Sequence, residues 1–250
     1  MENNNFFNVN GNNSQWSSNR VQSVKYAGNS YVFTALLKNV YLWMALALLI
    51  TAVTSVFVVS HPAIIQAIIT NKLLFFGMII AELVLVVLLS AKIWQMTFIN
   101  AFMSFLTYSL LNGLTLSTIF LVYTQSSIAT VFFVSAGMFA VMSVIGFVTK
   151  KDLSSWGRIL LMALIGIIIA SVVNIFVASS RLDWMISYVG VLLFSGLTVY
   201  DTQKIKHMLM SYGTDISDQT KKIALLGSLN LYLDFINLFL SLLRIFGNRS

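Results

Sequence analysis

The chain has 250 residues, of which 58% are hydrophobic and 9% are charged, and its formal net charge is +7. A soluble domain usually carries about a quarter charged residues, so this composition predicts that most of the surface faces lipid. The sequence contains no cysteine, which excludes disulfides, thiol catalysis and cysteine-ligated zinc or iron–sulfur centres.

Residues 1–34 form a polar segment that is rich in Asn and Ser. Such a composition cannot bury a core, so we expect a mostly disordered tail. The segment lacks the charged start, short apolar stretch and small-residue cleavage site of a signal peptide. The first apolar run would then serve as an uncleaved insertion signal.

Residues 35–250 carry apolar runs that follow one another with short loops between them. Each run is close to or above the roughly 20 residues that a helix needs to cross a bilayer core. Backbone groups in lipid must be satisfied within the segment, so each run is predicted to be an α-helix. The predicted spans are 35–59, 73–91, 97–122, 127–148, 159–178, 184–205 and 224–246.

Three acidic residues lie inside the predicted spans: Glu82, Asp201 and Asp234. A charge at membrane depth costs about 2.5–3.5 kcal/mol even on insertion scales, so these residues are the first candidates for function. Glu82 and Asp234 each lie about 15 Å from the end of their predicted helix, too deep for a short side chain to reach water. By these boundaries Asp201 lies near the membrane surface, so it would meet Asp234 only if the last span starts deeper, tilts or breaks.

Polar side chains also recur at helical spacing in two spans. In the last span they are Asn230, Asp234, Asn237 and Ser241, and in the third they are Asn100, Ser104, Thr107, Thr115 and Thr118. Such stripes are expected to point into the bundle. They could line a permeation path or could serve as interhelical hydrogen bonds, and for the third span we favour the second interpretation.

Two buried carboxylates can share one proton or can bind a hard cation through their oxygens, and either arrangement would respond to pH. Alternatively, each acid simply pairs with a base, for which Lys92 and Arg244 are candidates. Proteolysis by an aspartyl pair would need two acids at matching depth, which the predicted boundaries do not supply. The serines of the fourth span, Ser135 and Ser143, have no histidine at membrane depth to activate them. The sequence therefore favours a non-enzymatic role.

Most Lys and Arg residues lie in the segments on the amino-terminal side of the membrane. The positive-inside rule then predicts a cytoplasmic amino terminus and, after seven spans, a carboxyl terminus outside. The same rule accounts for the positive charge without nucleic acid as a partner. The basic residues on the predicted cytoplasmic side are Arg20, Lys25, Lys38, Lys92, Lys150, Lys151, Arg158, Lys204, Lys206, Lys221 and Lys222.

Three stretches of the sequence carry a resemblance to a known family. They are Leu111-Asn112-Gly113-Leu114-Thr115-Leu116-Ser117, Gly196-Leu197-Thr198-Val199-Tyr200-Asp201-Thr202-Gln203, and Asn230-Leu231-Tyr232-Leu233-Asp234-Phe235-Ile236-Asn237-Leu238-Phe239-Leu240 with Leu242-Leu243-Arg244 after it. Together they resemble the Bax inhibitor-1 family, also called the transmembrane Bax inhibitor motif family. The chain is most similar to its bacterial, YccA-like members, and the resemblance extends from the first span to the end.

The resemblance implies an all-α membrane protein in which six helices surround a central seventh. It implies a pH-sensitive Ca²⁺ leak beside that helix, with Ca²⁺ as the permeant or regulatory ion and no other cofactor. By motif match, Asp201 and Asp234 would be the pH sensor and Ca²⁺ ligands, and Glu82 and Arg244 would take part in gating. The resemblance also implies an alternative role as a substrate and modulator of a membrane-bound AAA protease of the bacterial inner membrane.

Overall fold

The computed structural model describes residues 10–212 and 215–249, with side chains from residue 31 onward. All regular structure within these residues is helical; the one β-bridge joins Tyr123 and Arg249. The α-helices are α1 Asn10–Val59, α2 Pro62–Thr70, α3 Lys72–Lys92, α4 Phe98–Leu116, α5 Gln125–Val148, α6 Ser154–Val177, α7 Ser180–Tyr212 and α8 Asp218–Phe246, with short 3-10 turns η1 Ile93–Gln95 and η2 Ser117–Leu121.

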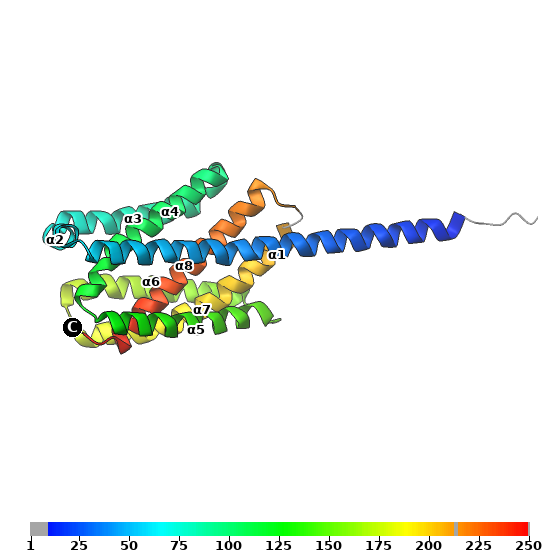
Figure 1. Ribbon diagram of the computed structural model, residues 1–250. Coiled ribbons are helices and arrows are strands. Elements are labelled where there is room, and N and C mark those ends of the chain that lie inside the picture. The colour runs from blue at the N-terminus through cyan, green and yellow to red at the C-terminus, as the bar shows by residue number, and fades with distance from the viewer. Residues whose placement is uncertain (1–9, 213–214, 250) are drawn as a thin grey trace, which may run out of the picture.

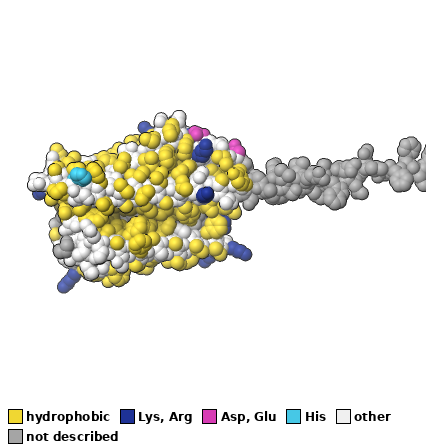
Figure 2. Space-filling view, viewed as in Figure 1, with side chains coloured by type: hydrophobic (Ala, Val, Ile, Leu, Met, Phe, Trp, Pro, Cys, Tyr) yellow, Lys and Arg dark blue, Asp and Glu magenta, His cyan; other side chains and the backbone are white. Residues whose placement is uncertain are grey.

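Seven of these helices are long and apolar enough to cross a membrane, as the sequence predicts. They lie side by side in one bundle, and hydrophobic side chains spread over the face seen in Figure 2. Figure 1 shows the α7–α8 connection at the end from which α1 projects, whereas α2 and the carboxyl terminus lie at the opposite end. We call the first of these the basic end, because Lys150, Lys204 and Lys221 lie toward it.

Helix α2 was not predicted, because its nine residues are too few to span a membrane. Pro62 stands at its first turn, where a missing backbone N–H costs nothing. Ile65 and Ile68 are buried against Val58 and Met78. The apolar residues after the first span therefore pack back onto the bundle.

Helix α1 differs from the predicted boundary of the tail. It is continuous from Asn10, and Val32 and Phe33 already pack against the core. A helix that is already nucleated gains one hydrogen bond for each residue added, so it can continue past the apolar run. Within residues 1–34, residues 1–9 lie outside the described part of the chain.

Helix α8 is the most enclosed element, with 72% of its most apolar window buried. It packs on α1, α4, α5 and α7. Helices α3 and α6 pack instead on α4 and α7 respectively, and no residue of α6 is buried. The structure thus shows seven helices with α8 inside, whereas a complete ring of six helices around it is not shown.

Candidate functional site

The carboxyl groups of Asp201 on α7 and Asp234 on α8 lie within hydrogen-bonding reach of each other. Asp201 is 9% exposed and Asp234 is 4% exposed. Among the described residues, no donor gives a hydrogen bond to Oδ2 of Asp234. An ionised carboxylate only accepts, so a hydrogen bond within this pair requires a proton on one of the two groups.

The predicted ends of the two helices that carry these residues were wrong. Helix α7 continues to Tyr212 and α8 begins at Asp218, so both helices extend beyond the predicted ends at residues 205 and 224. Asp201 lies 11 residues before the end of α7, and Asp234 lies 16 residues after the start of α8. Because the two carboxyl groups nevertheless meet, the predicted difference in depth no longer argues against an aspartyl pair.

A groove of about 450 Å³ adjoins the pair. It is lined by residues of α6, α7 and α8 and by Val86 of α3. Its polar lining consists of Asp201, Lys204, Asn230, Asp234 and Asn237. Three of the four predicted stripe residues of α8 thus border one space.

The fourth stripe residue, Ser241, does not line the groove. Its hydroxyl donates to the Asn237 carbonyl at 2.8 Å. A Cβ added at Gly190 of α7 would lie 2.6 Å from the Ser241 Oγ. Ser241 therefore lies at a close contact between α7 and α8.

Two glycines hold α7 close to its neighbours around Asp201. A Cβ at Gly146 of α5 would collide with the Val199 carbonyl, and a Cβ at Gly157 of α6 would collide with the Tyr200 ring. Helices α5 and α6 can therefore approach α7 on both sides of the acid. These contacts could not be predicted from the sequence, because a glycine's partner depends on the tertiary fold.

Gln203 fixes the same segment to the α5–α6 connection. Its Oε1 accepts from the Leu153 N–H at 2.9 Å, and its Nε2 donates to the Thr149 carbonyl at 3.2 Å and the Lys151 carbonyl at 2.8 Å. The side chain is 3% exposed. The Tyr-Asp-Thr-Gln stretch thus supplies both an acid of the pair and, two residues later, an anchor for the loop.

Glu82 belongs to a separate polar cluster between α3 and α4. It accepts hydrogen bonds from Thr115 Oγ1 at 2.5 Å and Asn112 Nδ2 at 3.4 Å. Asn112 Nδ2 also reaches the Tyr108 hydroxyl at 3.5 Å, while its buried Oδ1 has no partner in the part of the chain that the structure describes. Glu82 is half-buried and does not line the groove beside the aspartates.

Further hydrogen bonds link α1, α4 and α8 next to this cluster. Thr51 Oγ1 donates to the Ser109 carbonyl at 2.9 Å and lies 2.7 Å from the Tyr232 hydroxyl. The Tyr232 and Tyr108 rings meet edge to face, with centroids 5.8 Å apart. A polar and aromatic chain thus runs from Glu82 to Tyr232, two residues from Asp234.

Comparison with known proteins agrees with the resemblance. The family profile described as "Inhibitor of apoptosis-promoting Bax1" matches residues 34–250. The chain belongs to the Bax inhibitor-1 family. It is 50% identical over 211 residues to the inner membrane protein YbhL of Escherichia coli, covering 84% of this chain and 90% of that protein. It is 44% identical over 215 residues to an uncharacterized protein of Borreliella burgdorferi, covering 85% and 91% respectively.

Seven apolar helices and an inner-membrane relative together support a multi-pass inner membrane protein. In this Bax inhibitor-1 family member, none of Glu82, Asp201 and Asp234 forms an ion pair with a base within the described residues. Arg244 pairs with Asp183 at 3.7 Å, and both side chains are about two-fifths exposed. Simple pairing with Arg244 or Lys92 therefore does not account for the three acids.

The predicted inward stripe of the third span was wrong in part. Asn100 and Thr107 are exposed, and the Ser104 and Thr107 hydroxyls donate to the Asn100 and Met103 carbonyls of their own helix. A hydroxyl satisfied by its own helix can face outward at low cost. Of this stripe, Thr115 alone reaches an acid, Glu82, among the contacts described.

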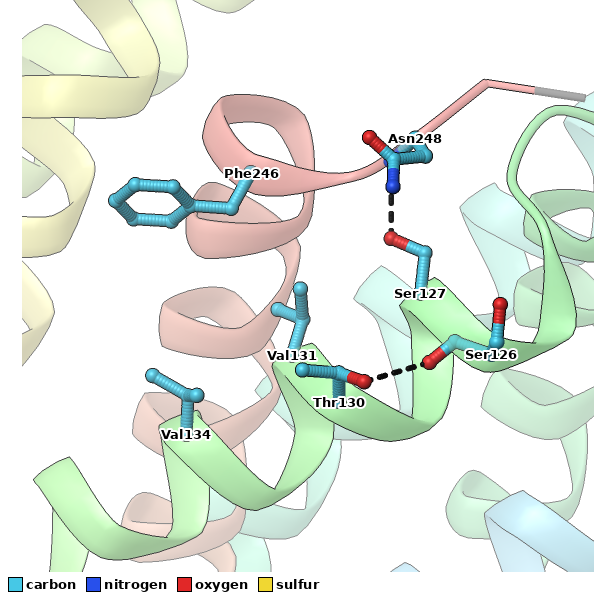
Figure 3. A pocket seen from close by; sticks show the side chains of 7 residues that line it. All are labelled: Ser126, Ser127, Thr130, Val131, Val134, Phe246 and Asn248. Atoms are coloured by element: carbon cyan, nitrogen blue, oxygen red, sulfur yellow. Dashed lines mark hydrogen bonds between the residues drawn. The ribbon is translucent and has the colours of Figure 1, made fainter.

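A second pocket of about 410 Å³ lies at the opposite end of the bundle (Figure 3). There the Asn248 N–H donates to Ser127 Oγ at 2.9 Å and the Asn248 carbonyl accepts from the Thr124 N–H at 3.0 Å. Thr130 Oγ1 donates to the Ser126 carbonyl at 2.8 Å. These contacts tie the end of α8 to the start of α5 and assign the pocket a structural role.

Proposed function

We propose that this Bax inhibitor-1 family protein is a pH-sensitive cation leak whose permeant or regulatory ion is Ca²⁺. The observation that carries the proposal is the contact between Asp201 and Asp234 beside a groove between apolar helices. Acids placed there need a proton, a cation or water to compensate them. A leak path supplies all three.

The chemistry of the pair suits weak and reversible binding. Ionised, the two carboxylates offer oxygen ligands to a hard cation; sharing a proton, they offer less negative charge. Ca²⁺ takes six to eight oxygen ligands. Within the described residues no group of three or more His, Cys, Asp and Glu could hold a metal ion, so water and the Asn230 and Asn237 amides would complete the shell. A protein that supplies only part of the coordination shell binds the ion weakly, so the ion can leave the site and pass on.

We assign Glu82 and Arg244 to gating rather than to the binding site. Glu82 connects through its cluster to Tyr232 on α8, and Arg244 with Asp183 ties the far end of α8 to α7. Both sets of contacts therefore restrain the position of α8, the helix that carries Asp234. Ser241 supports the same helix through its contact with α7. The proposed orientation has the basic end in the cytoplasm, by the positive-inside rule.

The test is Ca²⁺ flux through reconstituted liposomes over a range of pH. Because protonation removes the charge that attracts the cation, wild-type flux should fall as pH falls. Asp201→Asn and Asp234→Asn should each lower the flux and remove its pH dependence, while Asp152→Asn, at an exposed position outside the spans, should behave as wild type. Flux and pH response unchanged in both aspartate variants would refute the mechanism.

A second candidate is a modulator or partner of a membrane-bound AAA protease. The observation that favours it is the projection of α1 beyond the bundle toward residue 10, which offers a segment for a protease to grip (Figure 1). Deleting residues 1–30 separates the two roles. Loss of protease coupling with intact flux supports the partner role, and the converse supports the leak.

The proposal remains non-enzymatic even though the aspartates meet. A leak requires the pair to exchange ions, whereas an aspartyl protease requires it to activate water against a peptide bond. Cleavage of a membrane peptide that either Asp→Asn variant abolishes would contradict the proposal.

A further inference from the structure

One stripe of α8 is left uncovered by the other helices. Between residues 223 and 243 every residue of this helix is buried except five, which are half-buried and recur at helical spacing. They are Leu226, Asn230, Leu233, Asn237 and Leu240. Three of them, Asn230, Leu233 and Asn237, line the groove beside the aspartates.

The uncovered stripe results from how α3 and α6 pack. Each lies against a single long neighbour, α4 or α7, and neither makes more than marginal contact with α8. The groove is bounded by α6 on one side and by Val86 of α3 on the other. It is therefore open between α3 and α6, on the side of the bundle that we expect to face the lipid tails.

The wall formed by α6 is apolar and extended. Gly157, Leu161, Leu164 and Ile168 line the groove at successive helical turns. Eleven residues at about 1.5 Å per residue give a wall of about 16 Å. This length fits a large part of an acyl chain within one leaflet.

The groove carries a lysine and an amide at the basic end, and beyond the aspartates its lining is apolar except for Asn237. Lys204 follows Asp201 by three residues on α7, and Asn230 precedes Asp234 by four on the antiparallel α8, so both lie about one turn from the pair toward the basic end. The Asn230 amide makes no hydrogen bond within the described chain. In the opposite direction the groove ends among Leu164, Ile168 and Phe194.

We propose that this groove is a binding site for a membrane phospholipid that enters between α3 and α6. The phosphate lies at Lys204, the glycerol ester region accepts a hydrogen bond from Asn230, and one acyl chain follows the α6 wall. Lysine is a common phosphate ligand, and an unpaired amide at this depth costs free energy unless a ligand satisfies it. The order from charged to apolar matches a lipid of the leaflet at the basic end. Lipid binding at this site does not require ion flux through the protein.

The experiment counts bound lipid on the full-length protein. Detergent-purified, delipidated protein is titrated with a phosphatidylglycerol that carries 16- and 18-carbon chains, and bound molecules are counted by native mass spectrometry. Wild type should retain one phospholipid above a nonspecific background. Lys204→Ala should weaken binding about tenfold or more, as expected for a charge-assisted contact, whereas Lys150→Ala, at an exposed position outside the groove, should not.

A second pair of variants tests the apolar wall. Leu164→Trp fills the groove and should abolish the bound lipid, while Ile165→Trp on the exposed side of α6 should leave it unchanged. Diacylglycerol with the same chains should bind at least about tenfold more weakly, and inorganic phosphate should not compete. Unfolding temperatures in detergent identify any variant that fails to fold, in which case Leu164→Phe replaces Leu164→Trp.

Three outcomes overturn the proposal. Equal lipid retention by Leu164→Trp and Ile165→Trp places the lipid elsewhere. No retained lipid in wild type means that the groove holds only water. A dimer that Leu164→Trp disrupts means that a second copy of the chain covers the groove. Because the readout is mass, a failure of the leak hypothesis would leave these results unaffected.

Discussion

The Gln203→Glu substitution tests whether the α5–α6 connection is held by a single side chain. Glutamate has nearly the same shape as glutamine and keeps an oxygen to accept from the Leu153 N–H. It loses the two donors that now bind the Thr149 and Lys151 carbonyls. At neutral pH it also sets a negative charge against those two carbonyl oxygens.

The expected cost follows from the hydrogen bonds that are lost. Each net bond contributes about 0.5–1.5 kcal/mol, so two lost bonds give about 1–3 kcal/mol. The near-complete burial of Gln203 places the value toward the upper half of this range, because little water can replace the lost donors. At about 1.4 kcal/mol per factor of ten, opening of the loop should become about tenfold to a hundredfold more frequent.

Hydrogen exchange of the backbone amides at residues 149–153 measures this opening directly. We expect faster exchange at Leu153 in Gln203→Glu, and slower exchange again at acidic pH, where a protonated glutamate regains one donor. Gln219→Ala, at an exposed position on α8, is the matched control and should exchange as wild type. Unchanged protection of the Leu153 amide in Gln203→Glu would show that the loop is held by other contacts.

Three further predictions concern packing and local charge. Gly146→Ala should lower the free energy of unfolding by about 1–3 kcal/mol, because its Cβ would clash with α7. Gly137→Ala, whose added Cβ would meet nothing within 4 Å, should leave that free energy unchanged or raise it by up to about 1 kcal/mol. Unfolding in detergent compares the two variants. Hydrogen bonds from the Ser154 side chain and backbone lower the pKa of Asp152, so its contribution to stability is present at neutral pH and is lost as pH falls through that lowered pKa. An NMR titration should show the pKa rising in Ser154→Ala. Tyr232→Phe, which removes a hydroxyl bonded to α1, should cost about 1 kcal/mol in the same unfolding assay.

Composition and hydropathy predict the seven spanning helices because lipid leaves the backbone almost no alternative. The same reasoning predicts that Asp234 is buried, since an unpaired acid in contact with lipid is costly. Both conclusions depend only on the chain and its solvent. They need no knowledge of which helix neighbours which.

Partners between helices could not be predicted in the same way. Glu82 is satisfied by Thr115 and Asn112 from α4 rather than by a base, and Gln203 binds a loop rather than a helix. Many residue types can satisfy a buried carboxylate or amide, and the sequence does not say which of them is adjacent. Which residue is adjacent depends on the tertiary fold.

The end of α7 shows where reasoning from hydropathy fails. A hydropathy window ends a span where charges begin, at Lys204 and Lys206, but a helix ends only where its hydrogen bonds or packing end. Ile205, between those lysines, and Leu209, beyond them, are buried, and Ile205 packs against Gly227 of α8, so α7 continues to Tyr212. The thickness of the membrane sets the minimum length of a spanning helix, and the packing contacts of that helix set its actual length. The contact between the aspartates likewise follows from how α7 packs on α8, which hydropathy does not report.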